Sequence, residues 1–268
     1  MTDSGKTKEN TDIRIALLTE YDGTDFVGFQ RQNNGRSVQQ TLEEAVEKVY
    51  GRFCRIYGCS RTDSGVHARA HVSHVDVPFS IPENKIPLAL NAVMEDDLVV
   101  LAARVVPDSF HARFDAKGKR YCYRVRNTHV PSAIDRRTEA FVPGKLDVES
   151  MHDAAQAFVG THDFSAFRAQ GGPDISPIRT MKEVRVERNV QDKDLIEITV
   201  VGESFLYNMV RIMAGSLVYV GQGKMTKKEI ETLLTGEGAR KEAGKTMPAK
   251  GLTLEKVFYE NDPFLPNP

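Results

Sequence analysis

The sequence predicts an α+β protein built from two mixed α/β domains, and three observations lead to this fold class. The chain has 268 residues, which is enough for one large domain or two modest ones. Segments with the alternating pattern of strands and segments with helical spacing occur in both halves. A connector that begins at Pro107, PDSFHARFDAKGK, lacks apolar periodicity. We therefore expect a flexible tail over residues 1–11, a first domain over 12–107 and a second over 108–268.

In the first half, apolar spacing defines the expected elements. Residues 13–23 form an apolar run that ends in Asp-Gly, which predicts a strand followed by a turn. Ser37 is a suitable N-cap for a helix through Tyr50, because the apolar residues after it recur at helical spacing. The remaining elements expected here are a strand from Phe53, a glycine-bearing loop, a strand through Val72–Val77, a short helix in IPLALNAVM and a strand over 97–106.

In the second half, the same criteria predict another mixture of strands and helices. A helix over 148–159 should stop at Gly160. An apolar helix is expected over about 204–220, where SFLYNMVRIMAGSLVYV precedes GQG. The other expected elements are strands over 120–127, 181–188, 194–201 and 252–260, and a shorter helix after Thr226.

Composition narrows the class of protein. No apolar run approaches the roughly 20 residues that span a bilayer, and the first residues lack the apolar core of a signal peptide. Three cysteines, an odd number, fit free thiols in a reducing compartment, so we expect a cytoplasmic protein. Because the formal net charge is −1, any nucleic-acid binding requires basic residues gathered on one face.

The segment GCSRTDSGVHARA carries a candidate catalytic carboxylate. Asp63 is expected on a loop between two strands, with Arg61 two residues away to keep it ionised. An ionised carboxylate can act as a nucleophile or base at a sugar carbon. The alternative is that Asp63 caps a turn, since Asp-Ser-Gly is common turn chemistry.

A basic segment with interleaved tyrosines follows the connector. Between residues 112 and 126, six cations accompany one acid, Asp115. On a strand, Tyr121, Tyr123 and Val125 share one face, opposite to Arg120, Cys122, Arg124 and Arg126. Cations beside a stacking aromatic suit a single-stranded or flipped nucleotide. The alternative is a half-buried strand with core tyrosines and a solvated basic face. The six cations are Arg113, Lys117, Lys119, Arg120, Arg124 and Arg126.

Arg211 lies in the apolar helix expected over 204–220. With Ser204, Asn208 and Gly215 it forms one narrow polar stripe at helical spacing. A buried guanidinium without an acid is costly, so Arg211 requires a carboxylate from elsewhere. Asp63 would serve, and a structural ion pair with another acid is the alternative.

The sequence favours neither a metal nor a nucleotide cofactor. His67, His71 and His74 lie near Cys59, but strand alternation places His71 and His74 on opposite faces, and no CxxC pair accompanies them. The glycines near 221–223 and 236–238 lack the strand–loop–helix order of a phosphate loop.

Seven stretches, in order, resemble the tRNA pseudouridine synthase A family, usually called TruA. The most specific is RTDSGVHA (61–68). Together they cover nearly the whole chain after the tail. The others are YDGTDFVGFQRQ (21–32), SVQQTLEEAV (37–46), FHARFDAKGKRYCYRV (110–125), GTHDFSAF (160–167), FLYNMVRIMAGSLVYVGQGK (205–224) and PAKGLTLEKVFY (248–259).

The resemblance implies a role for each site residue. Asp63 would be the catalytic aspartate, Arg211 its partner and Tyr121 the side chain that stacks on uracil. Arg61 would help to displace the target nucleotide, and Leu252 would pack against the base. We expect Arg113, Lys119 and Arg120 to contact the RNA. Phe29 and Met247 depart from residues common in the family, outside the chemistry.

The resemblance also implies a pseudouridine synthase fold, a homodimer with a positively charged RNA-binding cleft, no cofactor and no metal, and tRNA as substrate. Its members modify uridines on the 3′ side of the anticodon stem-loop. Asp63 would either add to C1′ of the ribose or take a proton from C2′, and Tyr121 would hold the detached uracil and assist loss of the C5 proton. Two rival functions are a non-catalytic RNA-binding protein and a metal-dependent hydrolase that uses the three histidines.

Overall fold

One mixed sheet of ten strands runs through residues 12–172 and 174–265, which are the part of the chain that this computed structural model describes. Its strand order is β4-β1-β3-β10-β5-β9-β8-β7, with β2 beside β3 and β6 beside β5. The predicted tail over 1–11 lies outside the described residues. The strands are β1 (Ile13–Tyr21), β2 (Tyr57–Gly58), β3 (His67–Val77), β4 (Leu98–Val105), β5 (Ala116–Arg126), β6 (Ala140–Phe141), β7 (Gly160–Asp163), β8 (Ile178–Arg188), β9 (Leu195–Gly202) and β10 (Leu252–Tyr259).

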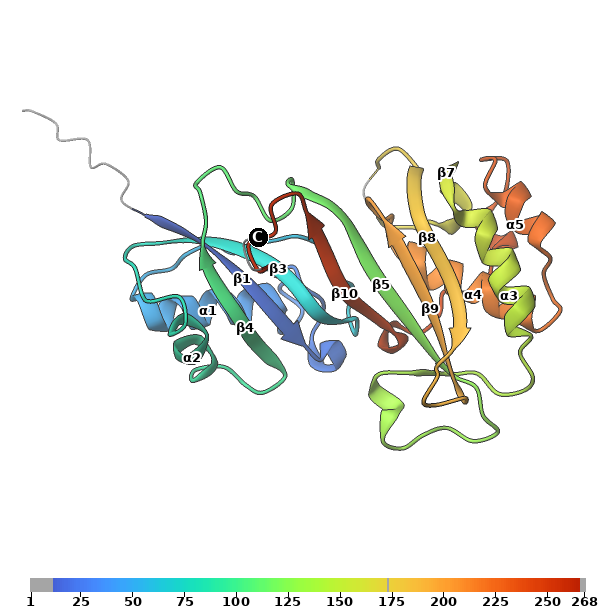
Figure 1. Cartoon of the computed structure of the whole chain (residues 1–268), viewed down its shortest axis with the longest axis horizontal. Coiled ribbons are helices and arrows are strands. Elements are labelled where there is room, and N and C mark those ends of the chain that lie inside the picture. The colour runs from blue at the N-terminus through green and yellow to red at the C-terminus, as the bar shows by residue number, and fades with distance from the viewer. Residues whose placement is uncertain (1–11, 173, 266–268) are drawn as a thin grey trace, which may run out of the picture.

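The α-helices lie in two groups, one near each end of the sheet (Figure 1). Helices α1 (Val38–Tyr50) and α2 (Ile86–Asn91) accompany the N-terminal strands. Helices α3 (Val148–Ala155), α4 (Met209–Gly221) and α5 (Lys227–Leu233) accompany β5, β8 and β9. Among the described residues, no helix has the length and apolar character needed to cross a membrane. This mixed architecture confirms the predicted α+β class.

Strand β10 joins the two halves of the sheet, although it comes from the end of the chain. It runs parallel to β3 through Thr253 and Leu254, and antiparallel to β5 along its length. The buried apolar side chains form one core cluster that includes residues of both halves. The sheet therefore continues across the connector at Pro107, and the division into two domains stays a prediction.

Several helix boundaries follow the capping signals in the sequence. The Ser37 side chain accepts from the N–H of Gln40, which confirms the predicted N-cap of α1. Thr226 and Glu229 cap α5 reciprocally. The helix expected over 148–159 is shorter, because α3 ends at Ala155 and a 3-10 turn, Gln156–Phe158, follows it.

The helix predicted to begin near residue 204 begins instead at Met209. Asn208, before it, has a φ of 59°, and no other described residue except glycine has a positive φ. The carbonyl of Tyr207 accepts from the N–H of Ala169, and residues 204–208 lead into α4 through a turn rather than as a helix. Ser204 is therefore not on the helical stripe of Asn208, Arg211 and Gly215.

Gly215 lets a later segment run closely along α4. A Cβ at this position would lie 1.9 Å from the carbonyl oxygen of Lys245, so only glycine fits. The N–H of Met247 then donates to the carbonyl of Arg211. This contact leads the chain into Pro248 and the start of β10, beside the loop that carries Asp63 (Figure 1).

Candidate active site

The loop between β2 and β3 holds Asp63 through its backbone. Asp63 forms a bridge with Gly28, and the N–H of Phe29 donates to the carbonyl of Thr62 at 3.0 Å. Gly28 has a φ of 116°, and a Cβ there would lie 2.8 Å from the Thr62 oxygen. Within the described residues, the contact of the Asp63 carboxylate is to Arg211 and not to a backbone N–H, which argues against the turn-capping alternative.

Arg211 of α4 faces this carboxylate from the other half of the sheet. Its Nη1 lies 3.7 Å from Oδ2 of Asp63, an ion pair without a direct hydrogen bond. The guanidinium is fixed by two shorter contacts. Nη1 donates to Oδ1 of Asn208 at 2.6 Å, and Nε donates to the carbonyl of Met247 at 2.7 Å. The structure thus brings together the acid and the arginine that the sequence analysis expected to pair.

Burial raises the pKa of Asp63 above its usual value, and Arg211 opposes that rise. The side chain of Asp63 is 24% exposed and that of Arg211 is 16% exposed, so both are partly desolvated. The expectation that Arg61 keeps Asp63 ionised is wrong, because Arg61 is exposed and the cation that lowers the pKa of Asp63 is Arg211. The carboxylate is partly desolvated and balanced by one positioned charge.

Tyr121 lies against the same loop, tied to it by Ser60. Its hydroxyl is 3.1 Å from Oγ of Ser60, and its ring meets that of Phe205 edge-on at 5.1 Å. Only 6% of Tyr121 is exposed, and burial raises the pKa of its hydroxyl. A phenolate is therefore strongly disfavoured at this position.

Leu252 is the first residue of β10, opposite Tyr123 of β5 in the sheet register. It is buried, and Gly251 before it packs against the Tyr123 ring, where a Cβ would lie 2.6 Å from Cζ. The Tyr123 hydroxyl donates to the carbonyl of Pro248 at 2.8 Å. These contacts fix the PAKGL segment between Arg211 and β5.

The basic segment divides between the two faces of β5. Lys119, 9% exposed, shares the face of Tyr121 and comes near Cys59 and Arg113, while Arg113 itself is exposed. Arg120 points to the opposite face, with its guanidinium 5.8 Å from the centroid of the Phe258 ring. Of the predicted RNA contacts, Lys119 therefore lies on the side of Asp63 and Arg120 does not, while Arg113 lies beside His111.

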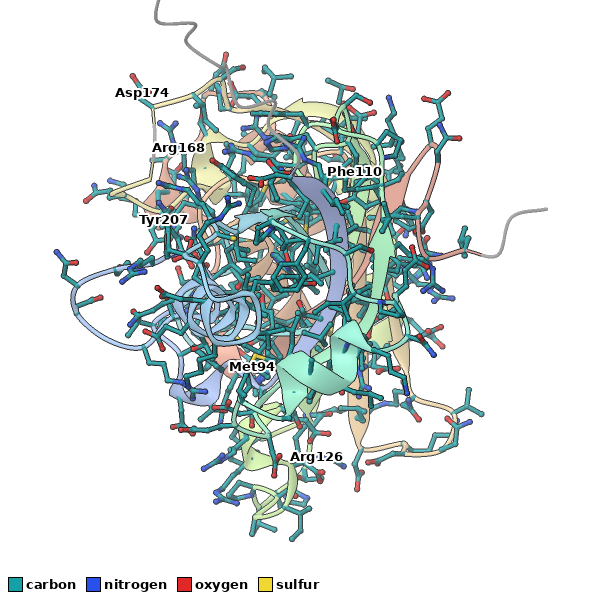
Figure 2. All side chains as sticks on the ribbon, turned by 90° about the vertical axis from the view of Figure 1, so that its left-hand side faces the viewer. Met94, Phe110, Arg126, Arg168, Asp174 and Tyr207 are labelled. Atoms are coloured by element: carbon teal, nitrogen blue, oxygen red, sulfur yellow. The ribbon has the colours of Figure 1, made fainter. Side chains whose placement is uncertain are left out.

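Acids neutralise the two arginines that follow on the Arg120 face. Arg124 pairs with Glu197 at 3.1 Å and with Glu255 at 2.9 Å. Arg126 pairs with Glu139 at 2.7 Å and with Asp192 at 2.6 Å, at the end of β5 far from Phe110 (Figure 2). These arginines hold strands and loops together rather than offer free charge.

The three histidines separate as predicted for His71 and His74. His71 stacks on Phe29 with centroids 4.2 Å apart, and its Nε2 is 3.0 Å from the carbonyl oxygen of Ser60. His74 stacks on Tyr57 on the other side of the sheet. Burial lowers the pKa of each to about 4, so both are neutral.

Sequence reasoning assigned no positioning role to three residues that hold the site, although it placed Asn208 on one stripe with Arg211. Ser60 holds Tyr121, Phe205 covers its ring, and Asn208 holds Arg211. Asn just before a helix indicates a left-handed residue, but Asn208 stands in that position only because α4 begins later than the sequence predicted. The other two depend on contacts between distant segments, which no local pattern encodes.

Comparisons with known proteins show which family this chain is similar to. A family model described as tRNA pseudouridine synthase matches residues 17–115 and 154–260. The chain is 44% identical over 245 residues to proteins named tRNA pseudouridine synthase A from Clostridium kluyveri and Acetivibrio thermocellus, matches that cover 91% of this chain and 99% of each relative. A protein of that name from Ruminiclostridium cellulolyticum is 44% identical over 246 residues, 92% of this chain and 99% of the relative.

Proposed function

This chain belongs to the tRNA pseudouridine synthase family and is an isomerase of that class, and we propose that it converts uridines of the tRNA anticodon stem-loop with Asp63 as the catalytic carboxylate. The observation that carries the proposal is the approach of Arg211 to Asp63 at 3.7 Å, from opposite halves of one sheet. Family membership removes the two rivals, a purely RNA-binding protein and a metal-dependent hydrolase.

The reaction breaks the bond from C1′ of the ribose to N1 of uracil and forms one from C1′ to C5. The target base has to leave its stack first, at a cost of about a few kcal/mol. Arg61, exposed beside Asp63 in sequence, is suited to fill the space that the base leaves. Lys119, on the Asp63 side, and the exposed Arg113 near it offset part of that cost through contacts with phosphates.

Asp63 acts on the ribose by one of two routes, addition to C1′ or removal of a proton from C2′. Both require the ionised carboxylate, which Arg211 favours against the effect of burial. A partly desolvated carboxylate is a stronger nucleophile and base than a hydrated one, because its charge is less stabilised by water. The 3.7 Å separation leaves Asp63 without a direct bond that has to break before it reacts.

Tyr121 and Leu252 hold the detached uracil. The raised pKa of Tyr121 argues against a phenolate that removes the C5 proton, so we assign it the holding role alone. Since its ring is 6% exposed and covered by Phe205, the base reaches it only after local side-chain movement on RNA binding. Leu252 supplies an apolar edge at the start of β10.

In this proposal the protein acts as a homodimer in the cytoplasm. The resemblance to the family supports the dimer and its charged cleft. Cys54, Cys59 and Cys122, all free and buried, support a reducing compartment.

The location of the modified uridines is tested with tRNA transcripts labelled with tritium at C5 of uridine. We expect the wild-type protein to release tritium without added metal or nucleotide. The matched control is the same transcript with cytidine in place of each anticodon stem-loop uridine, which should release none. Equal release from both transcripts would contradict the proposed site while leaving the enzyme class intact.

A further inference from the structure

A pocket of about 430 Å³ opens beside the Asp63 loop, separate from the Asp63–Arg211 pair. Its lining comes from three distant parts of the chain. Gly65 belongs to the Asp63 loop, Arg136 and Arg137 belong to the 3-10 turn Asp135–Arg137, and Lys250 belongs to the turn Ala249–Gly251. Thr24 completes the lining. Three of its five lining residues are therefore cations.

The charges of this pocket are poorly compensated. Within residues 12–172 and 174–265, no carboxylate lies within 4.0 Å of the charged groups of Arg136 or Lys250. Arg137 has only distant partners, at 3.8 Å from Asp22 and 3.7 Å from Asp25, and its side chain is 49% exposed. This contrasts with Arg126, whose nearest acids lie at 2.6 and 2.7 Å. The pocket is thus suited to an anion.

His67, the first residue of β3, links the two turns that carry these cations to the strand that follows the Asp63 loop. Its Nε2 lies 2.9 Å from the carbonyl oxygen of Arg137 and 3.2 Å from that of Lys250. Carbonyl oxygens only accept, so Nε2 carries a proton and donates to them. Nζ of Lys250 also donates to the carbonyl of Arg136 at 2.8 Å. Because His67 begins β3 only four residues after Asp63, the cations keep a fixed position relative to the catalytic loop.

We infer that this pocket binds a backbone phosphate of the RNA strand next to the flipped uridine, an inference that rests on the proposed function. Guanidinium and ammonium groups are the usual ligands of phosphate oxygens. A nucleotide whose ribose lies at Asp63 has a phosphodiester on either side, so one flanking phosphate is close to the loop that Gly65 extends. The phosphate held here fixes the strand while the base leaves its stack.

The test measures how tRNA affinity depends on salt. Each cation that contacts a phosphate adds to the slope of log K against log salt, by about 0.7 for single strands. We expect Arg137→Gln and Lys250→Gln each to reduce the slope by about that amount, and to raise KM by about 5-fold to 10-fold, more than they lower kcat. A slope equal to that of the wild type in both variants would overturn the inference.

Arg185→Gln is the matched control. The Arg185 side chain is also 49% exposed, and its acids, Glu183 and Glu187, lie at 3.6 and 3.3 Å. It lies on β8, outside the pocket, so its slope should equal that of the wild type. Arg136→Gln, which changes an exposed side chain, replaces either variant if that variant does not fold.

Failure of this inference is distinguishable from failure of the proposed function. If wild-type protein releases tritium and the pocket variants keep the wild-type slope, only the phosphate pocket is wrong. If wild-type protein releases no tritium from any transcript, the proposed function is wrong, and a reduced slope would then show a phosphate pocket that serves binding without that reaction.

Discussion

The two faces of β5 differ in how their cations are compensated. On one face Lys119 is buried beside Tyr121, and no carboxylate within 4.0 Å of its ammonium is found among the described residues. On the other, Arg124 and Arg126 are surrounded by acids from neighbouring strands and loops, while Arg120 lies over the Phe258 ring. Neighbouring residues of β5 therefore differ in role. Arg124 and Arg126 stabilise the fold on one face, and Lys119 lies at the candidate site on the other.

This difference teaches that charge density along a sequence is a poor measure of an RNA surface. The segment from 112 to 126 has six cations, but alternation along the strand separates them and acids from other elements neutralise part of the set. Among the described residues, Arg113, Lys119 and Arg120 have no acid within 4.0 Å, and of these Lys119 lies on the side of Asp63 while Arg120 faces the Phe258 ring. The uncompensated cations of the Arg136–Lys250 pocket come from segments that sequence reasoning did not count.

Among the cations, the largest expected effect comes from Arg211, which lies on the site side. Replacing it with Met removes the charge that opposes burial, so the pKa of Asp63 should rise further. Activity that needs the carboxylate is lost as pH falls through this pKa, so the acid limb of the kcat/KM profile should move to higher pH. We expect a loss of roughly 10²-fold or more at neutral pH.

Arg211→Lys is the matched control, because it keeps the charge but not the bonds to Asn208 and Met247. Its acid limb should stay near that of the wild type while its rate falls. An Arg211→Met enzyme with the wild-type pH profile would break the link between the two residues.

Arg124 tests the other face. Arg124→Met leaves Glu197 and Glu255 without their cation, and all three side chains are mostly buried. We expect the free energy of unfolding to fall by about 2–3 kcal/mol in urea titrations. The affinity for tRNA should not change, and a large loss of affinity without a loss of stability would show that this face binds RNA.

Lys119→Met should behave in the opposite way. Burial lowers the pKa of Lys119, so its charge costs stability in the folded state, and Met removes that cost. We expect tRNA affinity to fall about 10-fold with unchanged or higher stability. Destabilisation without loss of affinity would place Lys119 among the structural cations.

The smallest effect is expected at Tyr123. Tyr123→Phe removes the hydrogen bond to the carbonyl of Pro248 and keeps the ring against Gly251. The expected loss is about 1 kcal/mol of unfolding free energy, measured by denaturant titration. Activity should change little, because Arg211 is bonded to Met247, not to this hydroxyl. A large fall in rate would mean that the PAKGL segment depends on this bond for its position.

The sequence predicted elements with local signals well. Ser37 and Thr226 cap their helices as expected, and the paired strands β8 and β9 lie where alternation predicted them. The apolar helix was predicted to begin too early, because Phe205 and Leu206 are apolar without being helical: Phe205 packs against the Tyr121 ring and Leu206 is buried. Apolar runs do not distinguish the two.

The sequence predicted the reactive residues of the candidate site, but not the residues that hold them in position. A buried arginine without an acid nearby in sequence indicated a distant carboxylate, and Asp63 lies 3.7 Å away. The neighbouring Arg61 looked like the stronger influence on Asp63, because sequence distance suggests proximity. The effect of Arg61 on Asp63 is weaker because Arg61 is exposed and solvent screens its charge. Arg211 interacts with Asp63 on the partly buried side of the site, where screening is less.

The most direct test of the central claim is the single-turnover rate of tritium release by Asp63→Asn beside its tRNA affinity and thermal stability. Asn keeps the shape and cannot ionise, so we predict a rate lower by roughly 10³-fold or more with affinity nearly unchanged. Because the pKa of Asp63 is raised in the folded protein, the protonated carboxyl group favours folding, and this contribution is lost as pH rises through that pKa. At neutral pH the Asp63→Asn protein should therefore melt at an equal or higher temperature than the wild type. A stable Asp63→Asn protein that keeps the wild-type rate would contradict the assignment of Asp63 as the catalytic carboxylate.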